Sequence, residues 1–256
     1  MLLVENLGKE YNQGQPDAKR AVESVSFDVQ AGEFVCVVGP SGAGKTTLLR
    51  CLSGLSDPSW GSVQFNQTTL DGVPDDLAIV FQDYGRSLFP WFKVGQNVAL
   101  PLRLAGVGKA ERAERVADAL QSVGLADAAD RYPWQLSGGM QQRVAIARAL
   151  VGNPKLMMLD EPFASVDAQT RFELEDLLLR LRSQRDLTLV LVTHDIDESV
   201  YLGDRVVVLG SSPSVVVDTV PVDLPRPRDQ LSTRNLPAFG ALRTRILDTL
   251  MTNRSK

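Results

Sequence analysis

The sequence predicts an α/β fold, and three observations support this prediction. Short apolar runs such as residues 34–38 and 156–159 have the length and continuity of buried parallel strands. Helical patterns follow these runs, which is the order expected of strand–helix–strand units. Between residues 88 and 153 the strand signal disappears and helical patterns replace it. We therefore expect an α/β core that is interrupted by a helical insertion.

Composition narrows the classes of protein to which the chain could belong. Its 256 residues are 44% hydrophobic, enough for a large core, and 27 Lys and Arg against 31 Asp and Glu give a formal charge of −4. No basic block runs along the sequence, so we expect no nucleic-acid partner. No apolar stretch approaches the roughly 18 residues that a membrane span needs. Cys36 and Cys51 are expected to be small buried residues in a reducing cytosol.

The first 33 residues alternate short strand patterns with a turn-rich segment at residues 12–17, which predicts a small antiparallel β layer. Tyr11 is a lone aromatic residue in a polar part of this region. Such a residue is more often a surface or partly buried group than a ligand contact, so its position alone leaves both interpretations open.

A glycine-rich loop follows residues 34–38 and precedes a helical pattern. The loop and the first residue after it are Gly39, Pro40, Ser41, Gly42, Ala43, Gly44, Lys45, Thr46 and Thr47. Glycines let successive N–H groups point at one anion, and the helix adds the positive end of its dipole. We expect a polyphosphate, with Lys45 on its β- and γ-phosphates and the Thr46 hydroxyl on Mg²⁺. A chance match is on the order of a percent in a chain of this length.

Residues 77–81 form a further apolar run that predicts a buried strand, and Gln82 stands at its carboxyl end. In open α/β sheets ligands lie at that edge, so Gln82 is a candidate for the phosphate site. A solvated strand end explains its position equally well.

The insertion contains an amphipathic helix and a second candidate anion site. Residues 109–123 place apolar side chains on one face and charged ones on the other, and Gly124 ends the pattern. Ser137 has the position of an N-cap, and Gly138 and Gly139 leave the first amides of the next helix unobstructed. Ser-Gly-Gly before a helix is more often an ordinary cap than a phosphate contact, so both interpretations stay open.

Asp160 and Glu161 follow the apolar run at residues 156–159. Acids at the carboxyl end of a buried parallel strand lie beside the phosphate loop, where Asp160 would hold Mg²⁺ and Glu161 would orient or deprotonate a water. Adjacent strand residues point to opposite sides, so the two acids have different tasks. His194, the only histidine, follows a run at residues 187–192 and could donate a hydrogen bond to a γ-phosphate, although a lone histidine is more often structural.

Between and beyond these motifs the sequence predicts scaffold. A long helix should begin at residues 165–167 and run to about residue 185. Its expected buried face comprises Phe172, Leu174, Leu177, Leu178 and Leu181. A last strand at residues 206–209 precedes a proline-rich arm and one short helix, for which we expect no chemistry.

Five separated motifs occur in the order of a known family: GPSGAGKT, the glutamine of VFQD, LSGGMQQR, LMMLDEP and the histidine of VTHD. With them the chain resembles the nucleotide-binding subunit of an ATP-binding-cassette (ABC) transporter over residues 1–210. The resemblance implies a single domain over residues 1–256 with a P-loop NTPase (RecA-like) core at residues 1–87 and 154–210, including the N-terminal β layer. It makes residues 88–153 an α-helical subdomain that contains the signature motif, and residues 211–256 a C-terminal arm and short helix.

The resemblance also implies roles for individual residues. The catalytic residues would be Lys45, Gln82, Glu161, as the base, and His194, as the γ-phosphate sensor. The metal ligands would be Thr46, Gln82 and Asp160. Tyr11 would stack on adenine, and the loop residues 39–47 would hold the phosphates. Ser137, Gly138 and Gly139 would cap the γ-phosphate held by a second copy.

ATP and Mg²⁺ are therefore the implied cofactors, and the implied partners are a second copy in a head-to-tail dimer around two ATP molecules, a separate membrane permease and, indirectly, a solute-binding protein. The location would be the cytoplasmic face of the membrane. The signature has Gly-Gly-Met where Gly-Gly-Gln is commonest, and residues 164–167 read Ala-Ser-Val-Asp where Ala-Leu-Asp or Gly-Leu-Asp is usual. Neither change removes a phosphate contact. Asp167 would be a dimer contact.

Residues 88–94, with Asn97 and Val98, are most similar to importers of nitrate, sulfonates and taurine. Phe89, Trp91 and Phe92 either fill the core of the insertion or receive a short helix of the permease. The alternative function is a soluble ABC clamp, which usually has two cassettes or a long heptad insertion and a basic surface. A kinase or GTPase switch has no use for Ser-Gly-Gly. The sequence favours an ATPase that drives import.

Overall fold

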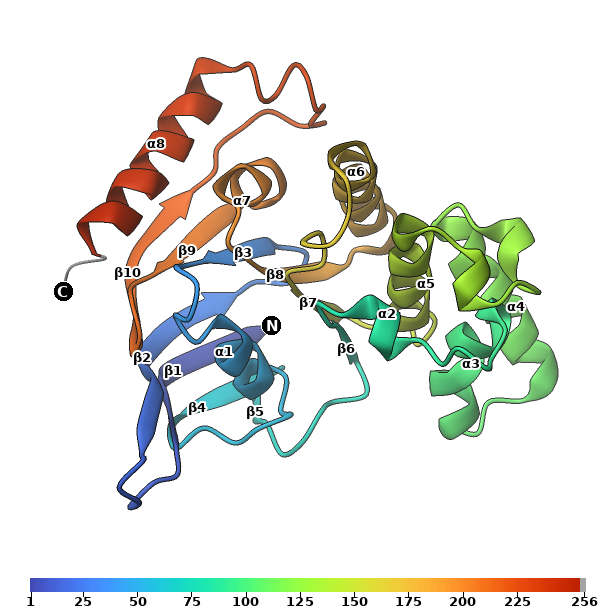
Figure 1. Ribbon diagram of the computed structural model, residues 1–256, viewed down its shortest axis with the longest axis horizontal. Coiled ribbons are helices and arrows are strands. Elements are labelled where there is room, and N and C mark those ends of the chain that lie inside the picture. Colours follow the sequence, from blue (N-terminus) through green and yellow to red (C-terminus); the bar gives the residue numbers. More distant parts are fainter. Residues whose placement is uncertain (254–256) are drawn as a thin grey trace. The chain divides into compact units, whose positions relative to one another are not determined.

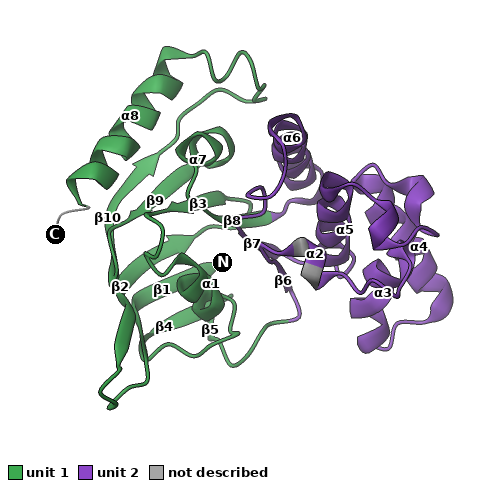
Figure 2. Cartoon of the chain, in the orientation of Figure 1, with its two compact units in different colours: residues 1–74, 188–256 green, residues 75–187 purple. Residues whose placement is uncertain are grey.

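The computed structural model describes residues 1–253, with only the backbone at residues 84 and 86. Its internal contacts divide the chain into two compact units, which Figure 2 distinguishes by colour. Unit 1 comprises residues 1–74 and 188–256, and unit 2 comprises residues 75–187. The phosphate loop and His194 belong to unit 1. The acid pair, Gln82 and the Ser-Gly-Gly segment belong to unit 2.

Unit 1 is built on a mixed sheet. Its strands are β1 (Leu2–Tyr11), β2 (Lys19–Val29), β3 (Phe34–Val38), β4 (Trp60–Phe65), β5 (Thr68–Thr69), β8 (Thr188–Thr193), β9 (Arg205–Leu209) and β10 (Ser214–Pro221). They lie side by side in the order β5-β4-β1-β2-β10-β9-β3-β8 (Figure 1). β1 pairs antiparallel with β2 and β4, which confirms the predicted N-terminal antiparallel layer. β3 pairs parallel with both β8 and β9.

The parallel strands of unit 1 form the centre of its core. Every residue of β3 and β8 is buried, as expected of parallel strands that are covered on both faces. Three helices belong to this unit: α1 (Lys45–Leu52), which contacts β1, β2 and β8, α7 (Ile196–Leu202), which contacts β3, β8 and β9, and α8 (Pro237–Thr252), which contacts α7, β9 and β10. Cys36 and Cys51 are buried as predicted, and burial raises the pKa of the Cys51 thiol.

Unit 2 combines two parallel strands, β6 (Leu77–Val80) and β7 (Leu156–Asp160), with a group of helices. The helices are α2 (Tyr84–Ser87), α3 (Val94–Leu104), α4 (Lys109–Ser122), α5 (Gly138–Leu150) and α6 (Ala168–Arg185), with short 3₁₀ turns at Ala126–Ala128 and Pro133–Gln135. Residues 88–153, all of them described, contain helices and turns and no strand, in agreement with the predicted insertion. α3, α4 and α5 contact one another, so each buries its apolar face against the other two.

Two predicted core positions were wrong. Phe172 is 40% exposed, because the buried face of α6 consists of Leu174, Leu177, Leu178 and Leu181, and a residue two positions before Leu174 points to the opposite side of the helix. Phe81 is 42% exposed, since β6 ends at Val80 and the chain leaves the strand there. The C-terminal helix α8 is also longer than predicted, at 16 residues.

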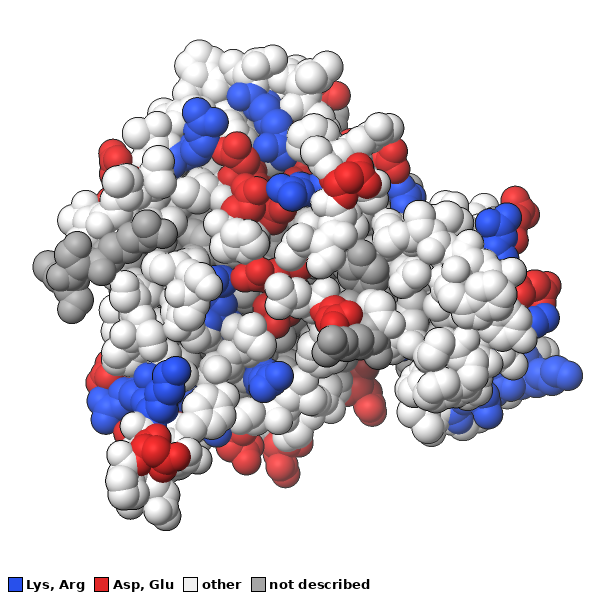
Figure 3. All heavy atoms as spheres, in the orientation of Figure 1, with Lys and Arg blue, Asp and Glu red and all other residues white. Residues whose placement is uncertain are grey.

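Charged side chains are distributed without large areas of one sign on the face that Figure 3 shows. Lys and Arg alternate there with Asp and Glu within each unit. The formal charge of the chain is only −4, and on that face the charges of opposite sign are not separated into two large patches. Every helix of residues 1–253 is too short or too polar to cross a lipid bilayer.

Candidate nucleotide-binding site

The phosphate loop joins β3 to α1, and at two of its positions the backbone has a positive φ angle that favours glycine. Gly42 and Gly44 have φ angles of 79° and 81°. At Gly44 a Cβ atom would also lie 2.5 Å from the carbonyl oxygen of Ala21, which excludes any side chain. α1 begins directly after Gly44, at Lys45. The loop therefore presents the first amides of this helix to an anion, as the sequence predicts.

Lys45 is held above the loop rather than in open solvent. Its side chain is 6% exposed, and Nζ donates to the carbonyl oxygens of Gly39 and Pro40 at 3.0 Å each. The neighbouring Thr46 is exposed at the first turn of α1. An ammonium held at the loop in this way lies where phosphate oxygens, which bear full charges, would be stronger acceptors than backbone carbonyls.

Tyr11 lies beside the loop, although the sequence position alone left this open. Its hydroxyl is 3.2 Å from the Thr47 Oγ1 atom on α1, and the residue is 38% exposed. Lys9 approaches the same ring, with Nζ 5.7 Å from its centroid. The end of β1 thus brings an exposed aromatic face to the helix that follows the phosphate loop, and stacking on adenine stays a prediction.

His194 lies at the same sheet edge as the loop. In the parallel pair of β3 and β8, Val38 is opposite Thr193. Gly39 and His194 are the next residues of their chains, so the register places the start of the loop and the histidine at adjacent strand ends. His194 is exposed, whereas Thr193 before it is 1% exposed. The structure therefore brings the loop and the only histidine to the same edge of the sheet.

The acid pair of unit 2 lies at the carboxyl end of β7. Asp160 is the last residue of this strand and is 3% exposed, and Glu161 comes next with a φ of 42°. Gln82 donates from Nε2 to the Glu161 Oε2 atom at 3.4 Å. β6 and β7 pair with Val80 opposite Leu159, so the register brings Gln82 to the acid. The left-handed backbone of Glu161 costs on the order of 1–2 kcal/mol for a residue with a side chain, a strain typical of functional sites.

The Ser-Gly-Gly segment begins α5. The Met140 amide donates to the Ser137 Oγ atom at 3.3 Å, which confirms Ser137 as the N-cap. Ser137 and Gly138 are both exposed. Gly139 has no room for a side chain, because a Cβ atom there would lie 2.3 Å from the Cγ2 atom of Thr170. The segment therefore has two exposed residues at the start of α5 and packs tightly against α6 at Gly139.

Thr170 is a supporting residue that the sequence analysis missed. Asp167 is the N-cap of α6: it accepts from the Thr170 amide at 3.0 Å and from the Thr170 hydroxyl at 2.6 Å. These hydrogen bonds, that from the hydroxyl above all, lower the pKa of the Asp167 carboxyl. Asp167 thus fixes the side chain that packs on Gly139, and its predicted contact with a second copy stays a prediction. The Asp-x-x-Thr spacing of a helix start was the available signal.

The residues present fit magnesium bound together with a nucleotide. Thr46 offers a hydroxyl and Asp160 a carboxylate, which are the oxygen ligands that Mg²⁺ prefers. Residues 1–253 contain no group of three or more His, Cys, Asp or Glu that could hold a metal ion by itself. Mg²⁺ usually takes one or two protein oxygens plus substrate phosphates and water, so a dedicated cluster is not required.

An aromatic cluster lies where α2 leads into α3. The rings of Phe89, Trp91 and Phe92 contact one another with centroids 5.5, 5.6 and 6.3 Å apart. The side chain of Asn97, which is fully buried, accepts from the Phe89 amide at 2.8 Å and donates to the carbonyls of Phe89 and Phe92. Trp91 is 67% exposed on this fixed turn. It is therefore not part of the core of the insertion.

Comparisons with known proteins give one family. The family model described as "ABC transporter" matches residues 22–164. An uncharacterized ABC transporter ATP-binding protein of Methanocaldococcus jannaschii is 45% identical over 251 residues, which cover 97% of this chain and 91% of that protein. A bicarbonate transport and a nitrate import ATP-binding protein of Synechococcus elongatus are each 41% identical over 95% and 91% of this chain. This chain spans 37% and 36% of those two proteins.

Solved structures agree with the sequence comparisons. A dimeric ATP-binding cassette in a post-hydrolysis state, bound to ADP and Pi, is 32% identical with a TM-score of 0.75, over 87% of this chain and 99% of that chain. CbiO1 of Clostridium perfringens, part of the ABC transporter complex CbiONQ, is 30% identical with a TM-score of 0.78, over 86% of this chain and 88% of that chain.

Proposed function

Because this chain belongs to the ABC transporter family and is an ATPase, we propose that it hydrolyses ATP to drive a separate membrane permease that imports a small solute. The observation that carries the proposal is the placement of the phosphate loop and His194 at one sheet edge, fixed by the pairing of Val38 with Thr193. Unit 2 contributes a carboxylate, Glu161, with a glutamine amide on it. A permease partner puts the chain at the cytoplasmic face of the membrane.

Hydrolysis needs a base, a cradle for the phosphates and a group that senses the γ-phosphate. We assign the base to Glu161, which would take a proton from the attacking water. Lys45 and the loop amides would hold the β- and γ-phosphates, and His194 would donate to the γ-phosphate. Gln82, bonded to Glu161, would help to orient the water. Thr46, Gln82 and Asp160 are the residues that we assign to Mg²⁺, which would supply positive charge to neutralise charge developing on the phosphates.

We further propose that two copies close head-to-tail around two ATP molecules, with Ser137, Gly138 and Gly139 of one copy on the γ-phosphate held by the other. The exposure of Ser137 and Gly138 supports this role, because an exposed helix start can bind a phosphate that another chain holds. The dimeric cassette that resembles this chain supports dimer formation.

Mixing two inactive variants tests the shared site. Ser137→Arg should abolish hydrolysis without lowering the affinity of the isolated subunit for ATP, and Lys45→Ala should lose ATP binding. A mixed dimer contains one intact composite site, so recovered hydrolysis supports the proposal. Loss of ATP affinity in the isolated Ser137→Arg subunit would contradict it, because the segment would then act on nucleotide in its own chain.

The solute is proposed from the importers that the chain resembles. Residues 88–94 and the nitrate and bicarbonate relatives indicate a small solute, either an anion such as nitrate, bicarbonate or a sulfonate, or the zwitterion taurine. The test is co-expression with a multi-span chain, if a neighbouring gene encodes one, followed by reconstitution in vesicles with the solute-binding protein and a screen of these solutes for stimulated ATP hydrolysis. Stimulation by one of them supports the proposal, and stimulation only by an unrelated class of solute contradicts it.

The permease contact is assigned to the aromatic cluster of Phe89, Trp91 and Phe92. Clustered aromatic rings with an exposed member commonly mark a docking site, and a short apolar helix is a ligand that such a patch receives. The turn is rigid because buried Asn97 ties both of its ends, so docking would not have to order it first.

A further inference from the structure

The segment between β10 and α8, residues 222–236, contacts the helix that follows His194. We call this segment the C-terminal arm; Figure 1 shows it between the two elements it joins. Arg228 of the arm donates from Nη1 to the carbonyl oxygens of Tyr201 at 2.7 Å and Gly203 at 2.8 Å. Tyr201 belongs to the last turn of α7, and Gly203 is its C-cap. The guanidinium thus caps the carboxyl end of α7.

A cap of this kind matters more for α7 than for a longer helix. The last carbonyls of a helix have no partner inside it, and together they bear partial negative charge. A guanidinium supplies hydrogen bonds to several of these carbonyl oxygens through its planar group of N–H donors, and its positive charge interacts favourably with the negative end of the helix dipole. α7 has only seven residues, about 10 Å of helix at 1.5 Å per residue. Helices this short are not stable without such contacts.

The other end of α7 fixes the backbone around His194. Asp195 is the N-cap and accepts from the Glu198 amide at 3.1 Å. The Thr193 hydroxyl donates to the Glu198 carboxylate at 2.7 Å and accepts from the Asp195 amide at 3.0 Å. His194 therefore lies between two residues that are both bound to the first turn of α7. A shift of this short helix would move the histidine with it.

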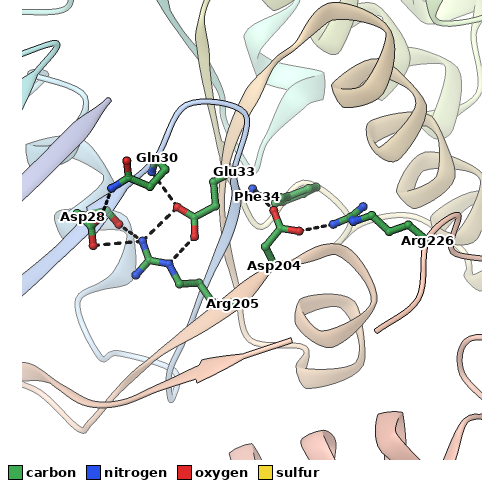
Figure 4. Close-up of polar contacts among 7 residues, drawn as sticks. All are labelled: Asp28, Gln30, Glu33, Phe34, Asp204, Arg205 and Arg226. Atoms are coloured by element: carbon green, nitrogen blue, oxygen red, sulfur yellow. Dashed lines mark hydrogen bonds and ion pairs between the residues drawn. The ribbon is translucent and has the colours of Figure 1, made fainter. Parts of the chain in front are cut away.

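Further contacts of the same C-terminal region keep α7 in place. Arg226 of the arm binds the Asp204 carboxylate, which also accepts from the Phe34 amide at 2.9 Å, so the arm is tied to the start of β3 (Figure 4). The guanidinium of Arg234 lies 4.8 Å from the ring centroid of Tyr201, a fully buried residue of α7. The arm therefore contacts both the end of α7 and the strand on which the phosphate loop is mounted.

We propose that the C-terminal arm positions His194 for ATP hydrolysis, and that Arg228 is the positioning residue, acting through α7. This inference rests on the proposed role of His194 at the γ-phosphate. The arm does not touch the nucleotide: it sets where the histidine stands relative to the loop. Any partner or modification that removes Arg228 from the α7 carbonyls would lower turnover without displacing ATP.

The test replaces Arg228 by glutamine and by lysine and measures kcat and KM for ATP. A misplacement of a catalytic group by about 1 Å costs about 10²-fold in rate, so for Arg228→Gln we expect kcat to fall by about 10- to 100-fold. KM for ATP should change by less than about twofold, because the loop that binds the phosphates is untouched. Arg228→Lys keeps the positive charge but loses the planar set of N–H donors, so its kcat should lie between that of the wild type and that of Arg228→Gln.

His194 also provides a direct spectroscopic reporter, because it is the only histidine in the chain. The single imidazole signal in a proton–carbon correlation spectrum should shift or broaden in Arg228→Gln. The matched control is Arg245→Gln, which removes another C-terminal arginine; it pairs at 2.9 Å with Asp218 of β10, and neither residue belongs to the arm or to α7. The control should leave kcat and the imidazole signal unchanged.

The outcomes separate this inference from the proposed role of His194. If His194→Gln keeps wild-type kcat, the role of the histidine fails and this inference with it. If His194→Gln is inactive while Arg228→Gln keeps both kcat and the imidazole signal, the inference alone is overturned, even where the melting temperature falls. Should Arg228→Gln not fold, Arg226→Gln and Arg234→Gln loosen the same arm. Unchanged kcat and an unchanged signal in both would overturn the inference.

Discussion

Replacing Trp91 by alanine tests whether the aromatic cluster is a docking surface. Truncating a buried Trp to Ala costs about 3–5 kcal/mol. Trp91 is 67% exposed, so about a third of it is buried and the cost should be about 1–1.7 kcal/mol. For a domain of this size each kcal/mol lowers the melting temperature by about 2–4 °C, which predicts a decrease of about 2–7 °C. The isolated variant should therefore fold and keep its basal ATP hydrolysis.

The assay compares two properties of the variant: its melting temperature as an isolated subunit, and its recovery on a tagged permease in detergent. Trp134→Ala is the matched control, because Trp134 is 69% exposed and lies in the same unit. Both variants should melt within a few degrees of the wild type, and only Trp91→Ala should lose recovery with the permease. A Trp91→Ala subunit that is strongly destabilised yet assembles normally would refute the docking assignment.

Three further predictions concern the nucleotide site. Lys45→Ala should lose both ATP binding and turnover, because the ammonium contacts phosphate in the ground state and in the transition state; a fluorescent ATP analogue measures this, and retained affinity would count against the assignment. Gly139→Ala should lower turnover, since its Cβ would lie 2.3 Å from the Thr170 Cγ2 atom. Adding Thr170→Ser, which removes that methyl group and keeps the hydroxyl, should restore activity, and no recovery would show that the contact is not the cause. Asp167→Ala should lower stability by about 1 kcal/mol through loss of the α6 cap. Asp167→Asn, which caps equally well, should melt within a degree or two of the wild type, and equal losses in both variants would exclude capping as the reason.

The sequence predicted the parts of the site that local patterns specify. The phosphate loop, the N-cap at Ser137, the start of α6 near residue 167 and the strand ends at Asp160 and His194 all follow from short motifs next to apolar runs. Because β3 and β8 pair in parallel, their carboxyl ends lie side by side, and this places the phosphate loop and His194 at the same edge of the sheet. These predictions needed only the period of strands and helices and the chemistry of their ends.

Contacts between distant segments could not be predicted in the same way. The hydroxyl of Tyr11 bonds to Thr47, 36 residues further along the chain, and nothing near Tyr11 in the sequence signals that partner. No chemistry was expected of the region that contains Arg228. Its partners are backbone carbonyls of α7, and because every residue has a carbonyl, no sequence pattern indicates this contact. Phe172 was misplaced because it is apolar, although two residues before Leu174 is the opposite side of α6 from the buried leucines.

The oligomeric state and turnover of Glu161→Gln test the central claim most directly. The amide has the size of the carboxylate but cannot accept the proton of the attacking water, so ATP should bind and hydrolysis should fall by at least about 10²-fold. Light scattering with saturating ATP and Mg²⁺ should then give the mass of a dimer, held closed by the nucleotide that it cannot hydrolyse. Turnover at the wild-type rate, or a monomer under saturating ATP, would contradict the assignment of Glu161 as the base of a dimeric ATPase.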